Sequence, residues 1–228
     1  MTILPPTDAA TDLGHVVVID DDPSVRRSLC TMLERAGYRV TEYESADAFL
    51  QNPIPPSPVV LLLDMRMPGT TGVMLQAKLK TLVTHPVPIV FVSGDSRPDE
   101  IISAMKQGAV DFLLKPFTAQ AMLDVITRAM QVAVQSQEVS NKQAMVSARL
   151  QRLTPRELEI CHWMVRGFSN QQIASLDGGA AATIKLHRSR VMEKMQANTL
   201  PELIEMLRGI ELPAPAPELN ASESRVLD

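Results

Sequence analysis

The stretch that most constrains the fold of this chain is VVLLLDMRMPG, residues 59–69. Its apolar run from Val59 to Leu63 shows no alternation with polar residues, which is typical of a strand buried on both faces of a parallel sheet. The run ends in a single carboxylate, Asp64. In open α/β sheets, ligands bind at the carboxyl ends of the strands. The stretch therefore predicts an α/β protein with Asp64 at the ligand-binding edge of its sheet.

Three further apolar runs also end in polar side chains. The run 16–19 is followed by three consecutive aspartates, the run 88–92 by a serine, and the run 112–114 by a lysine. Because parallel strands end at one edge of a sheet, we expect these groups to meet Asp64 there. The predicted pocket contains Asp20, Asp21, Asp22, Ser93 and Lys115.

The order of the elements predicts the fold of the first half. Strand-like runs alternate with helix-compatible segments over residues 15–130, which gives five strand–helix units and hence a parallel sheet covered on both faces. The Pro-rich segment 52–58 is predicted to be a loop. Residues 119–150 contain no Gly or Pro, and we favour two helical pieces with a flexible polar middle at 135–143 over one long connecting helix.

Helix starts mark a second, all-helical module. Capping sequences begin at Thr154, Ser169 and Thr199, and two of them place a proline in the first helical turn. A tight turn at 177–179 precedes a further helix, predicted over 181–195. A helix, a tight turn and a basic helix together indicate a helix-turn-helix.

The basic helix carries the candidate DNA contacts. Its apolar residues Ile184, Val191 and Met195 are predicted to face inward, which leaves the basic side chains on or beside the exposed face. The alternative is that Arg188 and Arg190 only form the hydrated surface of the helix and contact no DNA. We predict DNA contacts by Lys185, His187, Arg188, Ser189 and Arg190.

Composition places limits on compartment and organisation. The net charge is −4, but residues 14–127 carry 13 acidic and 10 basic side chains, whereas residues 151–210 carry 6 and 8. The two cysteines are predicted to be buried thiols, and no run approaches the roughly 20 apolar residues of a membrane span, so we expect a cytoplasmic protein. The predicted divisions are an N-terminal tail (1–13), an α/β domain (14–130), a partly helical linker (131–150), the helical module (151–210) and a disordered tail (211–228).

These motifs together resemble a known family. Asp20-Asp21, Asp64 with Pro68, Ser93-Gly94 and Lys115-Pro116 are similar to a bacterial response-regulator receiver domain. LTPRELEI and TIKLHRSRVMEKM resemble the LuxR/NarL-type helix-turn-helix, and the combination is most similar to FixJ/NarL-type transcriptional regulators. The resemblance implies a doubly wound, flavodoxin-like five-stranded sheet of order 2-1-3-4-5.

The resemblance also implies a role for each pocket residue. Asp64 would accept a phosphoryl group from a sensor histidine kinase, with Ser93 and Lys115 contacting that group and Ser93 and Phe112 acting as the switch pair. Mg²⁺ would be held by Asp20, Asp21, Asp64 and the Arg66 carbonyl, and the Lys115–Pro116 bond would be cis. Such regulators bind double-stranded DNA and dimerise on activation, with RNA polymerase a further partner and no membrane involved. They lose the phosphate by self-catalysed hydrolysis but are not conventional enzymes.

One segment departs from the family pattern. Where relatives place leucine, glycine, an apolar residue and then serine or threonine before the basic helix, this chain has Asp177, Gly178, Gly179 and Ala180. An alanine at the N-cap offers no side-chain acceptor to the first backbone N–H groups. We therefore expect a loosely started helix.

Two alternatives stand beside the regulator. Asp20-Asp21-Asp22 after an apolar strand also resembles a haloacid-dehalogenase-type phosphatase, in which Asp20 would be the nucleophile and Asp22 the acid. The second alternative is a receiver whose output module binds protein or RNA. The basic helix, which suits a DNA major groove, disfavours this second alternative.

Overall fold

The computed structural model describes residues 13–56, 58–83, 86–94, 97–210 and 212. It divides into two compact units, residues 1–140 and 141–228. The predicted tails 1–13 and 211–228 lie outside the described residues, except for Leu13 and Leu212. Each unit is built around its own hydrophobic core.

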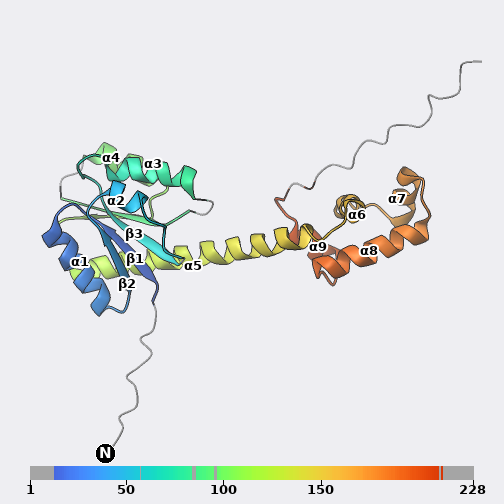
Figure 1. Ribbon diagram of the computed structural model, residues 1–228, viewed down its shortest axis with the longest axis horizontal. Coiled ribbons are helices and arrows are strands. Elements are labelled where there is room, and N and C mark those ends of the chain that lie inside the picture. The colour runs from blue at the N-terminus through green and yellow to red at the C-terminus, as the bar shows by residue number, and fades with distance from the viewer. Residues whose placement is uncertain (1–12, 57, 84–85, 95–96, 211, 213–228) are drawn as a thin grey trace, which may run out of the picture. The chain divides into compact units, whose positions relative to one another are not determined.

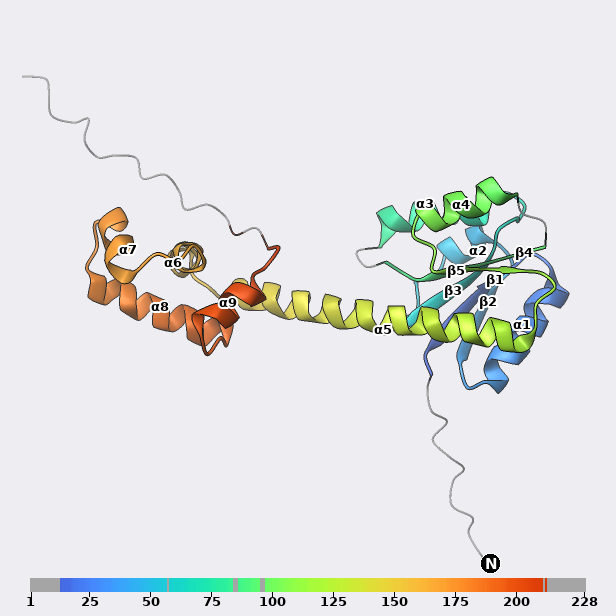
Figure 2. The same cartoon turned by 180° about the vertical axis from the view of Figure 1, so that it is seen from behind.

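The first unit contains a parallel sheet of five strands with the order β2-β1-β3-β4-β5; Figure 1 labels β1, β2 and β3, and Figure 2 labels all five. This is the order that the resemblance implied. The central strand β3 is buried along its whole length, as its unbroken apolar run predicted. The strands are β1 (His15–Ile19), β2 (Arg39–Tyr43), β3 (Val59–Asp64), β4 (Ile89–Ser93) and β5 (Asp111–Leu114).

Helices cover both faces of this sheet, which explains why the inner strands β1, β3 and β4 are apolar on both sides. The helices α1 (Pro23–Arg35) and α5 (Ala119–Leu150) cover one face, as Figure 2 shows from behind, and their residues share a core with Val16, Val18, Val60 and Val90. The other face is covered by α2 (Ala46–Leu50), α3 (Gly72–Leu82) and α4 (Pro98–Lys106).

Helix α5 differs from the sequence prediction. We favoured two helical pieces, but α5 is one helix of 32 residues. Most of the polar side chains at 135–143 are exposed, they include the good helix formers Gln, Glu and Lys, and without Gly or Pro nothing in the backbone interrupts the hydrogen-bond ladder. The prediction of a break was therefore wrong.

The second unit holds the last turns of α5 and four shorter helices. Val146 of α5 belongs to the core of this unit, and the Arg149 guanidinium donates to the Met195 carbonyl at the end of α8, 3.1 Å away. The caps Thr154, Ser169 and Thr199 each accept a backbone N–H as predicted. The helices are α6 (Pro155–Val165), α7 (Asn170–Asp177), α8 (Ala181–Met195) and α9 (Leu200–Met206).

A buried ion pair joins α6 to α8 in this unit. Glu157 is buried at the start of α6, and Lys194 donates to its carboxylate. Burial acts to raise the pKa of Glu157, but the hydrogen bonds from Lys194 and Thr154 outweigh it and lower the pKa overall. The pair ties the last turn of α8 to the start of α6.

Candidate functional site

The strand ends of the first unit form the predicted pocket. The Lys115 ammonium lies 2.8 Å from Asp20 Oδ2 and 3.8 Å from Asp64 Oδ1. Asp20 follows β1, Asp64 ends β3 and Lys115 follows β5, so the three come from separate strands. Both carboxylates are buried, at 1% and 8% exposure. The Lys115 ammonium thus faces two buried carboxylates at the carboxyl edge of the sheet.

The electrostatics of Asp64 follow from this arrangement. Burial raises the pKa of Asp64 to about 6; the Lys115 ammonium lowers it, and Asp20 and Asp21 raise it. Burial and the two neighbouring carboxylates together outweigh the Lys115 ammonium, so this pocket disfavours the ionised form of Asp64. A carboxylate in such a place favours an added cation.

Asp20, Asp21 and Asp64 fit such a cation. One carboxylate oxygen from each lies within 4.8 Å of the others, and Asp21 is exposed to solvent. Hard carboxylate oxygens suit a divalent cation such as Mg²⁺, which keeps several waters. The acidic triad is therefore consistent with a metal site that opens to water through Asp21.

Ser93 and Phe112 lie near the pocket on neighbouring strands. Ser93 is buried at the end of β4, and its carbonyl accepts a hydrogen bond of 2.8 Å from the Lys115 backbone N–H. Phe112 on β5 is half-buried and packs against the core formed with α2, α3 and α4. The Lys115–Pro116 peptide bond is cis, as the resemblance implied.

The turn from β3 into α3 depends on a glycine that the sequence analysis did not single out. A Cβ on Gly72 would lie 2.5 Å from the Asp64 carbonyl oxygen and 3.1 Å from the Cα of Met65. The start of α3 therefore approaches the end of β3 more closely than any other residue would allow. Only the tertiary packing reveals this requirement, because a lone glycine in sequence is not informative.

The sequence analysis named only the carbonyl of Arg66 and missed the partner of its side chain. The Arg66 guanidinium, two residues after Asp64, donates to Glu100 Oε2 at 3.1 Å, and Glu100 also accepts from the Arg97 backbone N–H at 3.1 Å. These bonds hold the pKa of Glu100 below its usual value, with the Arg97 N–H the larger cause. Residues 66 and 100 are too far apart in sequence for any pattern to have paired them.

In the second unit, α8 presents a partly basic face. Its residues Ile184, Val191 and Met195 are buried as predicted, and Lys185, Ser189 and Arg190 are exposed. The sequence prediction is less apt for the other two candidates. His187 and Arg188 are half-buried, and Arg188 Nη1 donates to the Phe168 carbonyl at 2.9 Å.

The position of Arg188 shows a structural role that the sequence did not reveal. Its guanidinium is partly committed to holding the segment between α6 and α7, and burial lowers its pKa. A side chain with this structural role is a poorer candidate for a DNA contact than Lys185 or Arg190. The helical wheel alone could not show this, because the partner is a backbone carbonyl 20 residues earlier.

The start of α8 has the predicted defect. Ala180 is the N-cap and makes no side-chain capping hydrogen bond, while the preceding helix α7 ends at Gly178 in the left-handed conformation, with φ of 67°. The N–H groups of the first turn thus lack the side-chain acceptor that a serine would supply.

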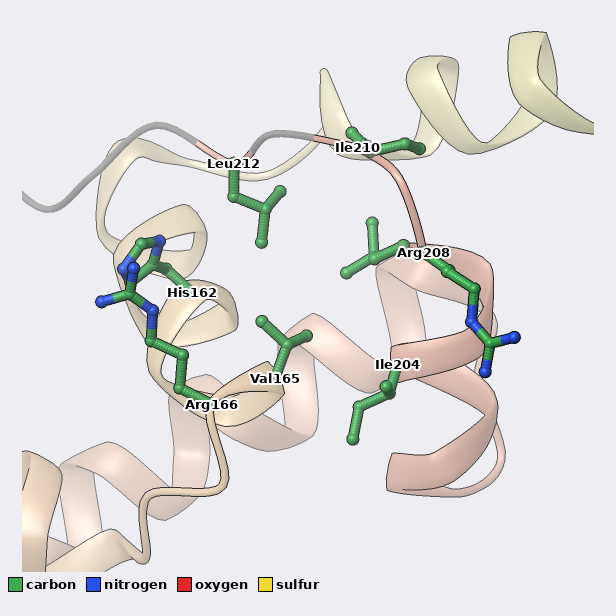
Figure 3. A pocket seen from close by; sticks show the side chains of 8 residues that line it. His162, Val165, Arg166, Ile204, Arg208, Ile210 and Leu212 are labelled. Atoms are coloured by element: carbon green, nitrogen blue, oxygen red, sulfur yellow. The ribbon is translucent and has the colours of Figure 1, made fainter.

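A cavity of about 510 Å³ lies between α6 and α9, and Figure 3 shows the side chains around it. None of the predicted DNA contacts lines it. His162 lines it and is buried in contact with the Trp163 ring. Of the described residues, only Asp20, Asp21 and Asp64 form a group suited to a metal ion, and His162 is not part of it.

Within the described residues, no helix is both long enough and apolar enough to cross a membrane. Cys30 and Cys161 are free thiols, as expected, and burial raises the pKa of Cys30 to about 12 and of Cys161 to about 11. Cys161 is buried, whereas Cys30 is only half-buried on α1. Thiols with such raised pKa values are protonated at neutral pH and therefore unreactive.

Comparisons with known proteins agree with the geometry. Residues 16–127 match the family model of the response regulator receiver domain, and residues 151–207 match that of the bacterial regulatory proteins of the luxR family. Nodulation protein W of Bradyrhizobium diazoefficiens is 36% identical over 208 residues, which is 91% of each chain. The transcriptional regulatory protein FixJ of the same organism is 38% identical over 199 residues, 86% of this chain and 95% of FixJ.

Solved structures give the same result. The response regulator StyR covers 86% of this chain and 98% of its own, with 36% identity and a TM-score of 0.75. Full-length FixJ from B. japonicum covers 87% and 97%, with 36% identity and a TM-score of 0.52.

These matches overturn the phosphatase alternative. The chain belongs to the response-regulator family: it is a FixJ-like, phosphorylation-dependent transcriptional regulator with a luxR-type DNA-binding helix-turn-helix, and not a conventional enzyme.

Proposed function

We propose that Asp64 is the residue that accepts the phosphoryl group. The observation that carries this proposal is the Asp64 carboxylate, buried at the end of β3 within 3.8 Å of the Lys115 ammonium and within 4.8 Å of two further carboxylates. A carboxylate that attacks phosphorus must overcome repulsion between anions, and fixed cations reduce that repulsion. Lys115 supplies one.

The transfer itself is a displacement at phosphorus. An Asp64 oxygen forms a bond to phosphorus while the bond from phosphorus to the histidine nitrogen of the sensor kinase breaks, and that nitrogen keeps the bonding electrons. Asp20, Asp21, Asp64 and the Arg66 carbonyl would hold Mg²⁺, which supplies charge neutralisation at the phosphoryl oxygens. Lys115 pairs with the new phosphoryl group, and the Ser93 hydroxyl donates to it.

The switch follows from the charge that phosphorylation adds. A phosphoryl group carries about −1.5 to −2 charges and three acceptor oxygens, so it draws the Ser93 hydroxyl toward it. Phe112, half-buried on the adjacent strand, then turns into the space that Ser93 leaves.

We propose that the activated chain forms a homodimer on double-stranded DNA, acts in the cytoplasm and works with RNA polymerase. We propose that the chain divides functionally into a receiver domain (14–130), a linker (131–150) and a DNA-binding domain (151–210).

A labelled phosphodonor tests the acceptor. Label from acetyl phosphate should enter the chain only with Mg²⁺ present and only with Asp64 intact. Mass spectrometry of the trapped acyl phosphate identifies the residue that carries it. Incorporation into Asp64→Asn at the level of the unmutated chain would refute the assignment.

DNA contacts are proposed for the exposed residues of α8. Lys185, near the start of the helix, is proposed to read a base, whereas Arg190 contacts a phosphate and Ser189 lies between them on the exposed face. His187 and Arg188 stay in the proposed set as contacts that first require their half-buried side chains to move.

Salt titration separates the two kinds of contact. Arg190→Gln should lower the log–log salt slope by about 0.9, and Lys185→Gln should cost about 1–3 kcal/mol on specific sites only. Arg188→Gln should instead destabilise the module, because the Phe168 carbonyl loses its donor. Equal losses for Lys185→Gln and Arg190→Gln on specific and random duplexes would leave no base reader between them.

A further inference from the structure

Arg66 lies two residues after the acceptor and ties its loop to α4. Its Nη2 donates to Glu100 Oε2 at 3.1 Å. Glu100 is in the first turn of α4, where its carboxylate also accepts from the Arg97 backbone N–H at 3.1 Å and from Arg97 Nη2 at 3.4 Å. The Arg66 side chain, from the loop that follows Asp64, therefore holds the first turn of α4, the helix that follows the next strand.

This tie is easily exchanged. The side chains of Arg66 and Glu100 are 47% and 29% exposed, and ion pairs with that much solvent contribute little to stability. A cavity of about 340 Å³ lies beside the pair and leaves the guanidinium room to move. The other residues that line it are Met65, Thr71, Val73, Asp99 and Ser103.

Phosphorylation changes which anion attracts the guanidinium more strongly. Glu100 offers a single negative charge and already accepts bonds from Arg97. A phosphoryl group on Asp64 offers about −1.5 to −2 charges and three oxygens, and the planar guanidinium pairs with phosphate through two parallel bonds. The stronger hydrogen-bond acceptor thus appears on Asp64, two residues before Arg66.

We propose that Arg66 contacts the phosphoryl group of phosphorylated Asp64. Before phosphorylation, the Arg66 guanidinium is bound to Glu100 instead. When Arg66 leaves, Glu100 keeps its bond to the Arg97 N–H, so α4 stays capped but loses its tie to the β3–α3 loop. The inference rests on the proposed function, because it takes Asp64 as the acceptor. It adds a ligand of the phosphoryl group and a release of α4 that are separate from Ser93 and Lys115.

Opposite effects of two substitutions test the exchange. Beryllium fluoride, which mimics the phosphoryl group, is titrated with Mg²⁺ into the full chain and its occupancy is followed by ¹⁹F NMR. Arg66→Gln removes a ligand and should raise the half-saturating concentration about two- to fivefold, the effect of a partly exposed ion pair. Glu100→Gln frees Arg66 and should lower it by a similar factor, while glutamine keeps the capping bond to Arg97.

Controls separate this exchange from a purely structural ion pair. Arg97→Gln removes the other guanidinium beside Glu100 and should leave the titration unchanged, and the double variant Arg66→Gln/Glu100→Gln should behave like Arg66→Gln alone. If Arg66→Gln and Glu100→Gln shift the titration in the same direction, or neither does, the inference is wrong. If the unmutated chain takes up no beryllium fluoride at Asp64, the proposed function itself fails, and the inference with it.

Discussion

Replacing Asp64 by asparagine is expected to stabilise the metal-free protein at neutral pH. The folded chain raises the pKa of this carboxyl from 3.8 to about 6, first through burial and then through Asp20 and Asp21, with Lys115 opposing them. A raised carboxyl pKa means that the folded state binds the proton more tightly than the unfolded state does. The ionised side chain therefore costs folding free energy, and the cost grows as the pH rises from below 4 to above 6.

The size of the effect follows from the same shift. Two units of pKa at about 1.4 kcal/mol each give a cost of about 3 kcal/mol at pH 8, and none below both pKa values. Asparagine has nearly the shape of the protonated acid and never ionises. Asp64→Asn should thus raise the free energy of unfolding of the first unit by up to about 3 kcal/mol at pH 8 and leave it unchanged near pH 3.

Urea unfolding in the presence of a chelator measures this difference. Circular dichroism follows both units, and the fluorescence of Trp163, the one tryptophan of the sequence, follows the second unit and serves as an internal control. Asp22→Asn is the matched variant: backbone N–H groups of Val25 and Ser24 lower the pKa of Asp22, so it should show no gain at pH 8. A gain for Asp64→Asn that is equal at pH 3 and pH 8, or absent at pH 8, would refute the reasoning.

Other predictions concern positions around both sites. Mg²⁺ should raise the melting temperature of the unmutated chain more than that of Asp64→Asn, since the cation relieves the repulsion among the carboxylates. Gly72→Ala should cost about 1–3 kcal/mol in urea unfolding, because its Cβ would meet the Asp64 carbonyl. Lys115→Ala should still bind Mg²⁺ in calorimetry yet gain little DNA affinity from a phosphodonor; a full gain would contradict its role. Ala180→Ser should stabilise the module by about 1 kcal/mol and slow amide exchange in residues 181–184, and unchanged exchange would mean that the helix start is already capped.

The helical caps show how far local sequence can predict this structure. Thr154, Ser169 and Thr199 accept the N–H groups that their spacing predicted, because a cap is decided by side chains within four residues. The break predicted in α5 was wrong because local sequence does not decide the structure of that segment. Polar residues at 135–143 are compatible with both helix and coil, and the choice depends on the packed turns at either end.

The chemistry of the receiver pocket was also predictable from sequence. An apolar run fixes where a buried strand ends, and parallel strands bring their ends together, so the sequence alone places Asp20, Asp64 and Lys115 at one edge. Their identities, and the resemblance they carry, follow from residue type and order alone. The family comparisons agree with that conclusion.

Tertiary structure alone decided which partner each long side chain takes. The Arg66 guanidinium finds Glu100, 34 residues away, and Arg188 turns to the Phe168 carbonyl although its place on the helix suggested DNA. The burial that raises the pKa of Asp64 likewise depends on the covering helices. The sequence itself determined where the strands end and where the helices start, because neighbouring residues settle those features. Long flexible side chains reach partners that only the folded chain brings close, so their contacts could not be read from the order of residues.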